Sequence, residues 1–172
     1  MNAARTKAST ETQSVTNFYT VETILSRADN KFDVLRFILG GDTVIEQPIR
    51  SEMDLIDLAK DGVKRASLVS VSNYLGVTMD RMSEILHVSP RTLQRKGEGN
   101  VLGVFSSEQA IEVAEVISTG LQVFGSIERF HKWLYGPLLS LGGTKPIDLL
   151  DTSFGTKLLV KELGRLEHGV FS

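Results

Sequence analysis

The sequence predicts an all-α protein. Apolar residues recur at steps of three and four along most of the chain, which is the spacing of one helix face. No run of alternating apolar and polar residues is long enough to predict a sheet, and no segment repeats at a fixed period. The 172 residues, of which 41% are hydrophobic, suffice for one domain or two small ones with a core of their own.

Composition excludes several classes of protein. The chain has 19 Lys+Arg against 21 Asp+Glu, a net charge of -2, so DNA binding would need a local basic face. The absence of cysteine excludes a disulfide scaffold, a thiolate zinc site and a cysteine nucleophile, and it fits a reducing compartment. Without a signal peptide or an apolar run of about 18 residues, we expect a cytoplasmic protein that does not enter a membrane.

The first 17 residues predict a disordered tail. Ser, Thr and Ala dominate this stretch, and it offers almost no apolar surface to offset the entropy of ordering. Its two cations, Arg5 and Lys7, are either solvated or in contact with an acidic partner.

Residues 18–50 predict an N-terminal extension. Thr20 suits the cap of a short helix with apolar residues at helical spacing. These are Val21, Ile24, Leu25 and Ala28. The run 32–39 is apolar but too short to distinguish a helix from a strand. Segment 43–49 contains Pro48, which is typical of a linker or an edge strand.

Residues 51–105 predict a series of short helices. Ser51 and Asp54 form a weak capping box at the start of the first, which ends at Gly62. The second helix has an apolar face of Leu68, Val71 and Leu75, and it ends at Gly76. Thr78 is the expected cap of the third.

The stretch 78–96, TMDRMSEILHVSPRTLQRK, has the pattern of a helix-turn-helix. Its apolar positions, which pack two short helices at a steep angle, are Met82, Ile85, Leu86, Val88 and Leu93. Ser89 suits the cap of the second helix, and Pro90 suits its first position. That helix presents donors for phosphates and base edges. The candidate DNA-binding residues are Ser89, Arg91, Thr92, Gln94, Arg95 and Lys96.

Two interpretations of this unit remain open. Segment 87–97 carries three positive charges and no acidic residue, which favours contact with DNA. The alternative is a helical hairpin with a solvated basic face. His87 stands at the turn position that Gly fills most often.

Residues 106–172 predict a second helical unit. Ser107 is the expected start of the longest helix, 108–123, which is either the element of a homodimer or part of the core. A helix with Ile127, Phe130 and Leu134 on one face follows and ends at 136–137. After a Gly/Pro loop over 137–147, Asp148 or Thr152 caps a final helix at 153–165. Its expected apolar positions are Phe154, Leu158, Leu159, Leu163 and Leu166.

Several motifs follow one another closely in this half of the chain. They are Phe124-Gly125, Trp133-Leu134 before Pro137, Leu141-Gly142-Gly143, KPIDLL at 145–150, Thr152, Gly155 and RLEHGV at 165–170. With SPRTLQRK at 89–96 they resemble the Xre/MbcA/ParS antitoxin family, densely over 78–170 and weakly over 51–77. The chain departs from the family at Leu138, where Asn is common, and at Lys145, where Arg is commoner.

The resemblance implies an Xre/Cro-like helix-turn-helix part over 51–105 and a small helical dimerisation and toxin-binding domain over 106–172. It implies that the protein represses its own operon by binding operator DNA. It also implies a partner, a RES-domain toxin that acts on NAD, whose active site the C-terminal domain obstructs. We expect a homodimer within a higher-order toxin–antitoxin complex, because paired recognition helices read palindromic DNA.

Candidate toxin contacts lie in the C-terminal half. Trp133 is either core or an interface anchor. Three cations at spacings of four form either a solvated face or a contact stripe on the final helix. The chain end either enters a cleft of the partner or frays. The full set is Trp133, Lys145, Lys157, Lys161, Arg165, His168, Gly169, Val170 and Phe171.

The sequence offers no catalytic signature. His87, His131 and His168 lack metal-ligand spacing, and the chain has no P-loop, G-x-G-x-x-G or G-x-S-x-G. We expect no enzyme activity, catalytic residue, metal or cofactor. Two alternatives to an antitoxin are a stand-alone transcription regulator with a ligand-sensing domain and an interaction scaffold that has lost DNA binding. A neighbouring gene for a RES-like protein argues against the first, and a gel shift with the operon's promoter decides the second.

Overall fold

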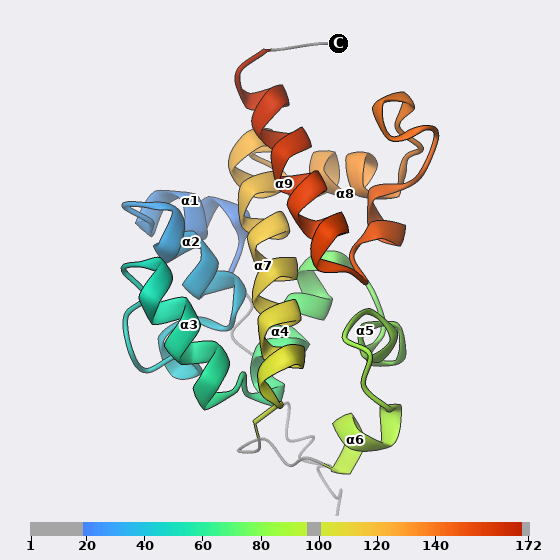
Figure 1. The fold of residues 1–172 in the computed structure, drawn as a ribbon. Helices are drawn as coiled ribbons and strands as arrows, with labels where there is room; N and C mark the ends of the chain where they lie inside the picture. Colours follow the sequence, from blue (N-terminus) through green and yellow to red (C-terminus); the bar gives the residue numbers. More distant parts are fainter. Residues whose placement is uncertain (1–18, 96–100, 170–172) are drawn as a thin grey trace, which may run out of the picture.

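The computed structural model describes residues 19–95 and 101–169, and the regular elements in these ranges are all helical (Figure 1). The α-helices of the described ranges are α1 Val21–Arg27, α2 Lys31–Ile38, α3 Glu52–Asp61, α4 Arg65–Leu75, α5 Met79–Ile85, α6 Pro90–Arg95, α7 Val104–Phe124, α8 Ile127–Tyr135 and α9 Ser153–Glu167. The same ranges contain three short 3-10 helices, η1 Gly41–Thr43, η2 Leu139–Leu141 and η3 Pro146–Leu149. The all-α prediction is confirmed, whereas the tail predicted at 1–17 lies outside the described residues.

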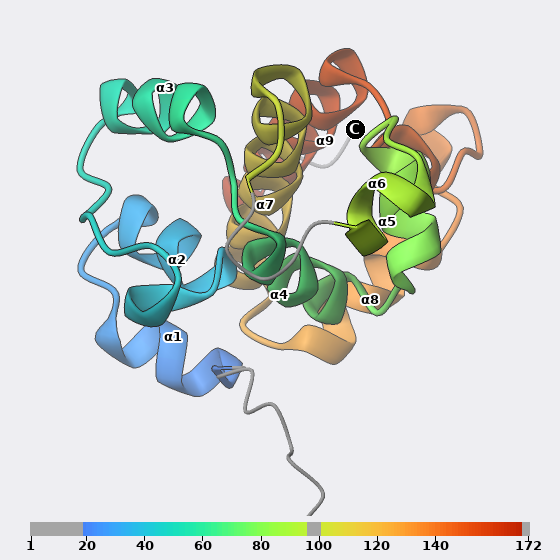
Figure 2. The same cartoon turned by 90° about the horizontal axis from the view of Figure 1, so that it is seen from below.

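α7 is the central helix of the molecule. It packs against α2, α3, α4, α8 and α9, and Figure 2 shows it in the middle of them. Most of its residues between Ser107 and Leu121 are buried. Gly120 leaves room for the ring of Phe130, which an added Cβ would overlap. This burial favours the core over the dimer element for the long helix expected at 108–123.

The predicted start of this helix is wrong. α7 begins at Val104 with Gly103 as its cap, and Ser107 lies inside the helix, fully buried. The Ser107 hydroxyl accepts a hydrogen bond from the Val63 N–H at 2.9 Å. That buried donor, 44 residues away in the chain, needs a partner away from water. Ser107 therefore satisfies a distant backbone group instead of the N-terminus of its own helix.

Local capping signals correctly predicted the starts of α1, α3, α5 and α9. In each case a side chain accepts a hydrogen bond from the N–H three residues on, and the caps are Thr20, Ser51, Thr78 and Thr152. Thr152, and not Asp148, thus caps α9, which runs to Glu167, beyond its expected end. Glycines with positive φ end α3, α4 and α7, and they are Gly62, Gly76 and Gly125.

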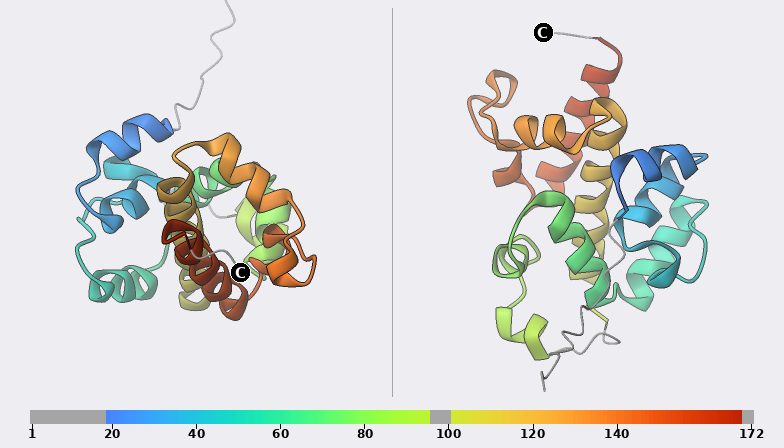
Figure 3. Two further views of the ribbon diagram at one scale, coloured as in Figure 1. Left: turned by 90° about the horizontal axis from the view of Figure 1, so that it is seen from above. Right: turned by 180° about the vertical axis from the view of Figure 1, so that it is seen from behind.

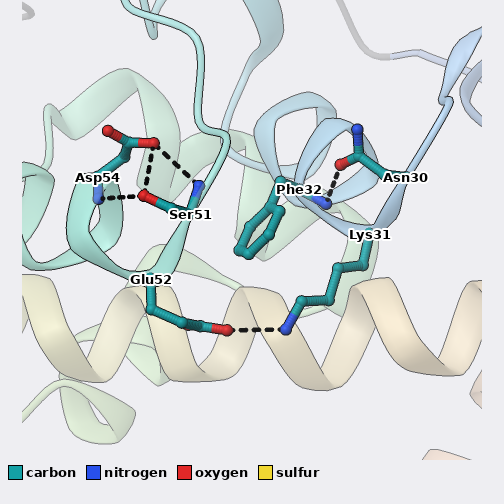
Figure 4. A network of polar contacts seen from close by, with 6 residues as sticks. All are labelled: Asn30, Lys31, Phe32, Ser51, Glu52 and Asp54. Atoms are coloured by element: carbon teal, nitrogen blue, oxygen red, sulfur yellow. Dashed lines mark hydrogen bonds and ion pairs between the residues drawn. The ribbon is translucent and has the colours of Figure 1, made fainter.

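The N-terminal extension is helical and packs on the centre of the fold. The ambiguous run 32–39 forms α2, which contacts α7. Asn30 caps α2 by accepting the Phe32 N–H at 2.8 Å. Lys31 then joins α2 to α3 through an ion pair of 2.8 Å with Glu52, beside the capping box at the start of α3 (Figure 4).

After Thr43, the last residue of η1, segment 43–49 is a loop, which agrees with the linker interpretation rather than with an edge strand. The Arg36 guanidinium donates to the Ile45 carbonyl through Nη2 at 2.7 Å, and it pairs with Asp42 at 2.6 Å. Within the described ranges the β-type pairings are two isolated bridges, Lys64 with Val101 and Leu138 with Thr144, and neither involves this segment. A side chain of α2 therefore organises the loop.

Candidate functional site

α5 and α6 form the helix-turn-helix that the sequence predicted. After α5 the chain turns at His87, whose φ of +52° is left-handed, a conformation unusual for a residue other than glycine. The turn closes with Val88 N–H on the Ser83 carbonyl at 3.0 Å. A distant contact supports the strained turn, because His87 Nε2 lies 2.6 Å from the Asp151 carbonyl and must donate to it.

α6 is short, and its N-terminus is well capped. The Thr92 N–H donates to Ser89 Oγ at 3.0 Å, and the hydroxyls of the same two residues share a hydrogen bond of 2.7 Å. Pro90 opens the helix, where its missing N–H has no cost. Leu93 is buried and anchors α6 to the core, whereas Arg91 is exposed. Ser89, Arg91 and Thr92 thus lie together at the exposed start of α6.

The other three candidate DNA contacts lie at the end of α6 and just after it. Gln94 and Arg95 belong to α6 by their backbone. Lys96 lies outside the described residues. The order of these residues along one short helix is the arrangement in which a recognition helix presents its N-terminal half to a groove.

Sequence reasoning missed a residue that holds α6 in place. Arg65, at the start of α4, donates from Nε to the Leu93 carbonyl at 3.2 Å. Leu93 lies in the last turns of α6, where carbonyl groups lack helical partners. The two residues are 28 positions apart, so neither periodicity nor a capping pattern could have revealed the contact.

The helix-turn-helix is also fastened to the segment that precedes α9. Arg81 on α5 pairs with Asp148 at 3.6 Å, in addition to Glu84 at 2.7 Å. Gln109 on α7 donates to the Leu150 carbonyl at 2.6 Å. The Arg81 ion pair and the contact between His87 and Asp151 connect the helix-turn-helix to residues 148–151, and the Gln109 bond connects α7 to the same segment.

α8 links the second unit to the first and contributes the core tryptophan. The Trp133 ring exposes 8% of its surface and lies 6.0 Å from the Phe124 ring and 6.1 Å from the Phe130 ring. These surroundings favour the core interpretation of Trp133 over the interface anchor, because its ring is almost completely covered by the chain itself. His131 and Tyr135 donate to backbone carbonyls at the end of α4, at 2.7 and 2.8 Å.

The cations of α9 are exposed, and two of them have partners within the chain. Lys157 lies 3.7 Å from Glu112, and Arg165 lies 3.2 Å from Glu162. Lys161 is exposed without an ion pair among the described residues. Of the three cations in this stripe, Lys161 is therefore the one without an ion-pair partner among the described residues.

The other predicted toxin contacts are also at the surface where they are described. Lys145 is exposed before η3, and His168 and Gly169 are exposed after α9. Val170 and Phe171 lie outside the described residues.

The apolar face expected for the final helix is partly wrong. Leu159 and Leu163 are fully buried, as predicted, but Phe154 exposes 90% of its surface and Leu158 exposes 43%. The core side of α9 begins with Gly155, which lies against the Leu149 carbonyl. Because neighbouring helical residues are rotated by about 100°, this contact turns Phe154 outward.

Neither a metal-binding cluster nor a single helix that could span a bilayer occurs among the described residues. No group of three His, Asp or Glu residues there could hold a metal ion. Surface hollows occur, and one between α7 and α9 is lined by Glu112, Glu115 and Lys157 among others. Burial raises the pKa of Glu115, and Lys31 opposes this rise.

Among the described helices, no single one is long and apolar enough to cross a bilayer. α7 and α8 pass this test only as a pair, and the pair is bent by 118°.

Two family models divide most of the chain between them. The Antitoxin Xre-like helix-turn-helix domain matches residues 54–115, and the Antitoxin Xre/MbcA/ParS C-terminal toxin-binding domain matches residues 119–169. The first includes α5, α6 and the first half of α7. Our boundary between 105 and 106 stays a prediction, because α7 packs against helices of both parts.

Relatives with known names support the same class. A Prs ADP-ribosylating antitoxin of Sphingobium sp. is 30% identical over 132 residues, which is 71% of this chain and 83% of that protein. An Antitoxin Xre of Yersinia enterocolitica is 27% identical over 122 residues, 69% of this chain and 81% of that protein. An Antitoxin Xre of Photorhabdus laumondii is 23% identical over 129 residues, 73% and 86% of the two chains.

A solved structure shares the fold. A chain of the crystal structure of the M. tuberculosis MbcT-MbcA toxin-antitoxin complex superimposes with a TM-score of 0.51 at 23% identity, over 63% of this chain and 96% of that one. Fold and comparisons together define the class, an antitoxin with a helix-turn-helix domain and a toxin-binding domain. The chain belongs to the Xre/MbcA/ParS antitoxin family.

Proposed function

We propose that this antitoxin neutralises a RES-domain toxin that acts on NAD, by direct contact that obstructs the toxin's active site. The observation that best supports this proposal is the match of residues 119–169 to a toxin-binding domain. The last helix of this region, α9, exposes cations and large apolar side chains. ADP-ribosylation, which the name of the Sphingobium relative includes, consumes NAD, and this supports an NAD-acting partner. Inhibition by occlusion is stoichiometric and needs neither catalysis nor a cofactor.

The second part of the proposal is repression of the protein's own operon through α6. Its exposed start carries Ser89, Arg91 and Thr92, and Arg95 follows within the same helix. Such donors suit phosphates and base edges in a major groove. α6 and the C-terminal end of α9 lie at opposite ends of the molecule in both side views (Figures 1 and 3). This separation supports simultaneous binding of operator DNA and toxin in the cytoplasm.

We further propose a homodimer on DNA, in which two copies of α6 read the two halves of a palindrome. In this proposal the contact between the two copies of the homodimer does not come from the middle of α7, which is buried within the chain. Instead, the exposed first turn of α7, with Val104 and Phe105, leaves apolar surface near the helix-turn-helix domain.

Co-expression with the product of the neighbouring reading frame tests the proposed function. We expect the two proteins to purify together and the antitoxin to restore growth to cells that express the neighbouring protein. A gel shift with the operon's own promoter tests repression separately. If poisoned cells die equally fast with the antitoxin present, neutralisation by this protein is excluded.

Deleting residues 169–172 is expected to weaken neutralisation without unfolding the chain. α9 ends at Glu167, and Gly169 is exposed, so the deletion removes no core contact among the described residues. Growth of toxin-expressing cells and the thermal midpoint of the purified protein are the two measurements. A V170S/F171S variant of full length is the control that separates loss of side chains from loss of chain. Full protection by the truncated protein would remove the tail from the mechanism.

A further inference from the structure

The outward face of α9 combines two large apolar side chains with two cations. Phe154, Leu158, Lys161 and Arg165 are three or four residues apart, so they share one side of the helix. Phe154 is 90% exposed, although the solvent side of a surface helix is normally polar. We name this set the α9 outer face.

Among the elements that the structure describes, none covers this face. The opposite side of α9 supplies the core contacts, through Gly155, Leu159 and Leu163. α7, which is the principal neighbour of α9, meets it through Thr156, whose hydroxyl donates to Glu112 at 2.9 Å. Within the part of the chain that the structure describes, Phe154 and Leu158 are therefore left open to solvent.

We infer that the α9 outer face is the hydrophobic anchor that holds the toxin. The inference rests on the proposed function and assigns the contact to particular residues. All of α9 lies within residues 119–169, so this face is continuous with the toxin-binding domain that defines the family. Interface cores are enriched in aromatic residues, and a few buried anchors carry most of the binding energy.

The cations of the α9 outer face indicate which charge the partner surface should carry. Arg165 already has Glu162 as its partner within the chain, whereas Lys161 has no ion pair among the described residues. Lys161 lies one turn from Leu158, so an apolar pocket with a carboxylate at its edge would satisfy both side chains. The α9 outer face thus fits a toxin surface that is apolar at its centre and acidic beside it.

A double variant, F154S/L158S, tests the inference. We expect its Kd for the purified product of the neighbouring reading frame, measured by isothermal titration calorimetry, to rise about 100-fold. The matched control is M53S, because Met53 is 61% exposed but lies in α3, outside the toxin-binding match. M53S is expected to bind like the original protein. The thermal midpoints of all three proteins should agree to within ~5 °C, because none of the substituted side chains is fully buried.

The outcomes separate the inference from the proposed function. If the original protein does not bind the toxin, the proposed function fails. If it binds but F154S/L158S binds equally well, or M53S is weakened as much, only the inference is overturned. Light scattering distinguishes a self-association face, since a change from dimer to monomer in F154S/L158S with unchanged toxin binding would assign the face to a second copy. Lys161→Glu is expected to weaken binding about tenfold, and unchanged binding would overturn the acidic edge.

Discussion

Gly155→Ala is expected to destabilise the protein by about 3 kcal/mol or more. A Cβ at this position would overlap the Leu149 carbonyl oxygen, and it would also come within 3.0 Å of Thr152 Oγ1. Neither atom can move freely, because one is backbone and the other caps α9 by accepting the Gly155 N–H. Relief of the overlap would therefore separate α9 from η3 or break the cap.

The displacement would also reach the DNA-binding unit. Residues 148–151, the first two of which belong to η3, contact Arg81 and His87 of the helix-turn-helix and Gln109 of α7. Urea denaturation followed by circular dichroism measures the loss of stability. Gly164→Ala is the matched control in the same helix, since an added Cβ there meets nothing within 4 Å. This control is expected to gain about 0.5–1 kcal/mol from helix propensity. An unchanged midpoint for Gly155→Ala would show that α9 and η3 are not held together as described.

The second large effect is expected for R91A/R95A, which should lose DNA binding while toxin neutralisation is retained. Loss of a base contact costs about 1–3 kcal/mol, so the two changes together weaken promoter binding on the order of 100-fold or more. Fluorescence anisotropy at several salt concentrations measures this. The slope of log K against log salt should also become shallower, because fewer phosphates are neutralised.

The control for charge alone is R129A/K132A, which removes two exposed cations from α8. Figure 1 shows α8 in the upper half of the molecule, away from α6. This variant is expected to bind the promoter like the original protein. Loss of both DNA binding and neutralisation in a still-folded R91A/R95A protein would show that the two activities do not belong to separate surfaces.

Helix boundaries and the helix-turn-helix were predictable because their signals are local. A cap such as Ser51 or Ser89 acts on an N–H three residues away, and a glycine such as Gly76 ends a helix through its own φ. The motifs over 124–170 indicated the antitoxin family, which the comparisons confirm. Which residues contact DNA or toxin stays a prediction.

The failures share a different physical origin. Ser107 satisfies the Val63 N–H, and Phe154 faces water because Gly155 takes the core position beside Leu149. Apolar spacing identifies candidate faces, but it does not reveal which side of a helix its neighbours occupy. The same limitation left α7 open between dimer element and core.

The chain's local chemistry thus determined an all-helical fold with its caps and its turn, since hydrogen bonds between near neighbours need no other part of the molecule. The resemblance of its motifs to a known family indicated an antitoxin. Only the tertiary structure decided that α7 is the core, that Arg65 and Asp151 support the helix-turn-helix, and that the α9 outer face is left uncovered. These features depend on groups brought together from distant parts of the chain, where burial obliges each polar group to find a partner.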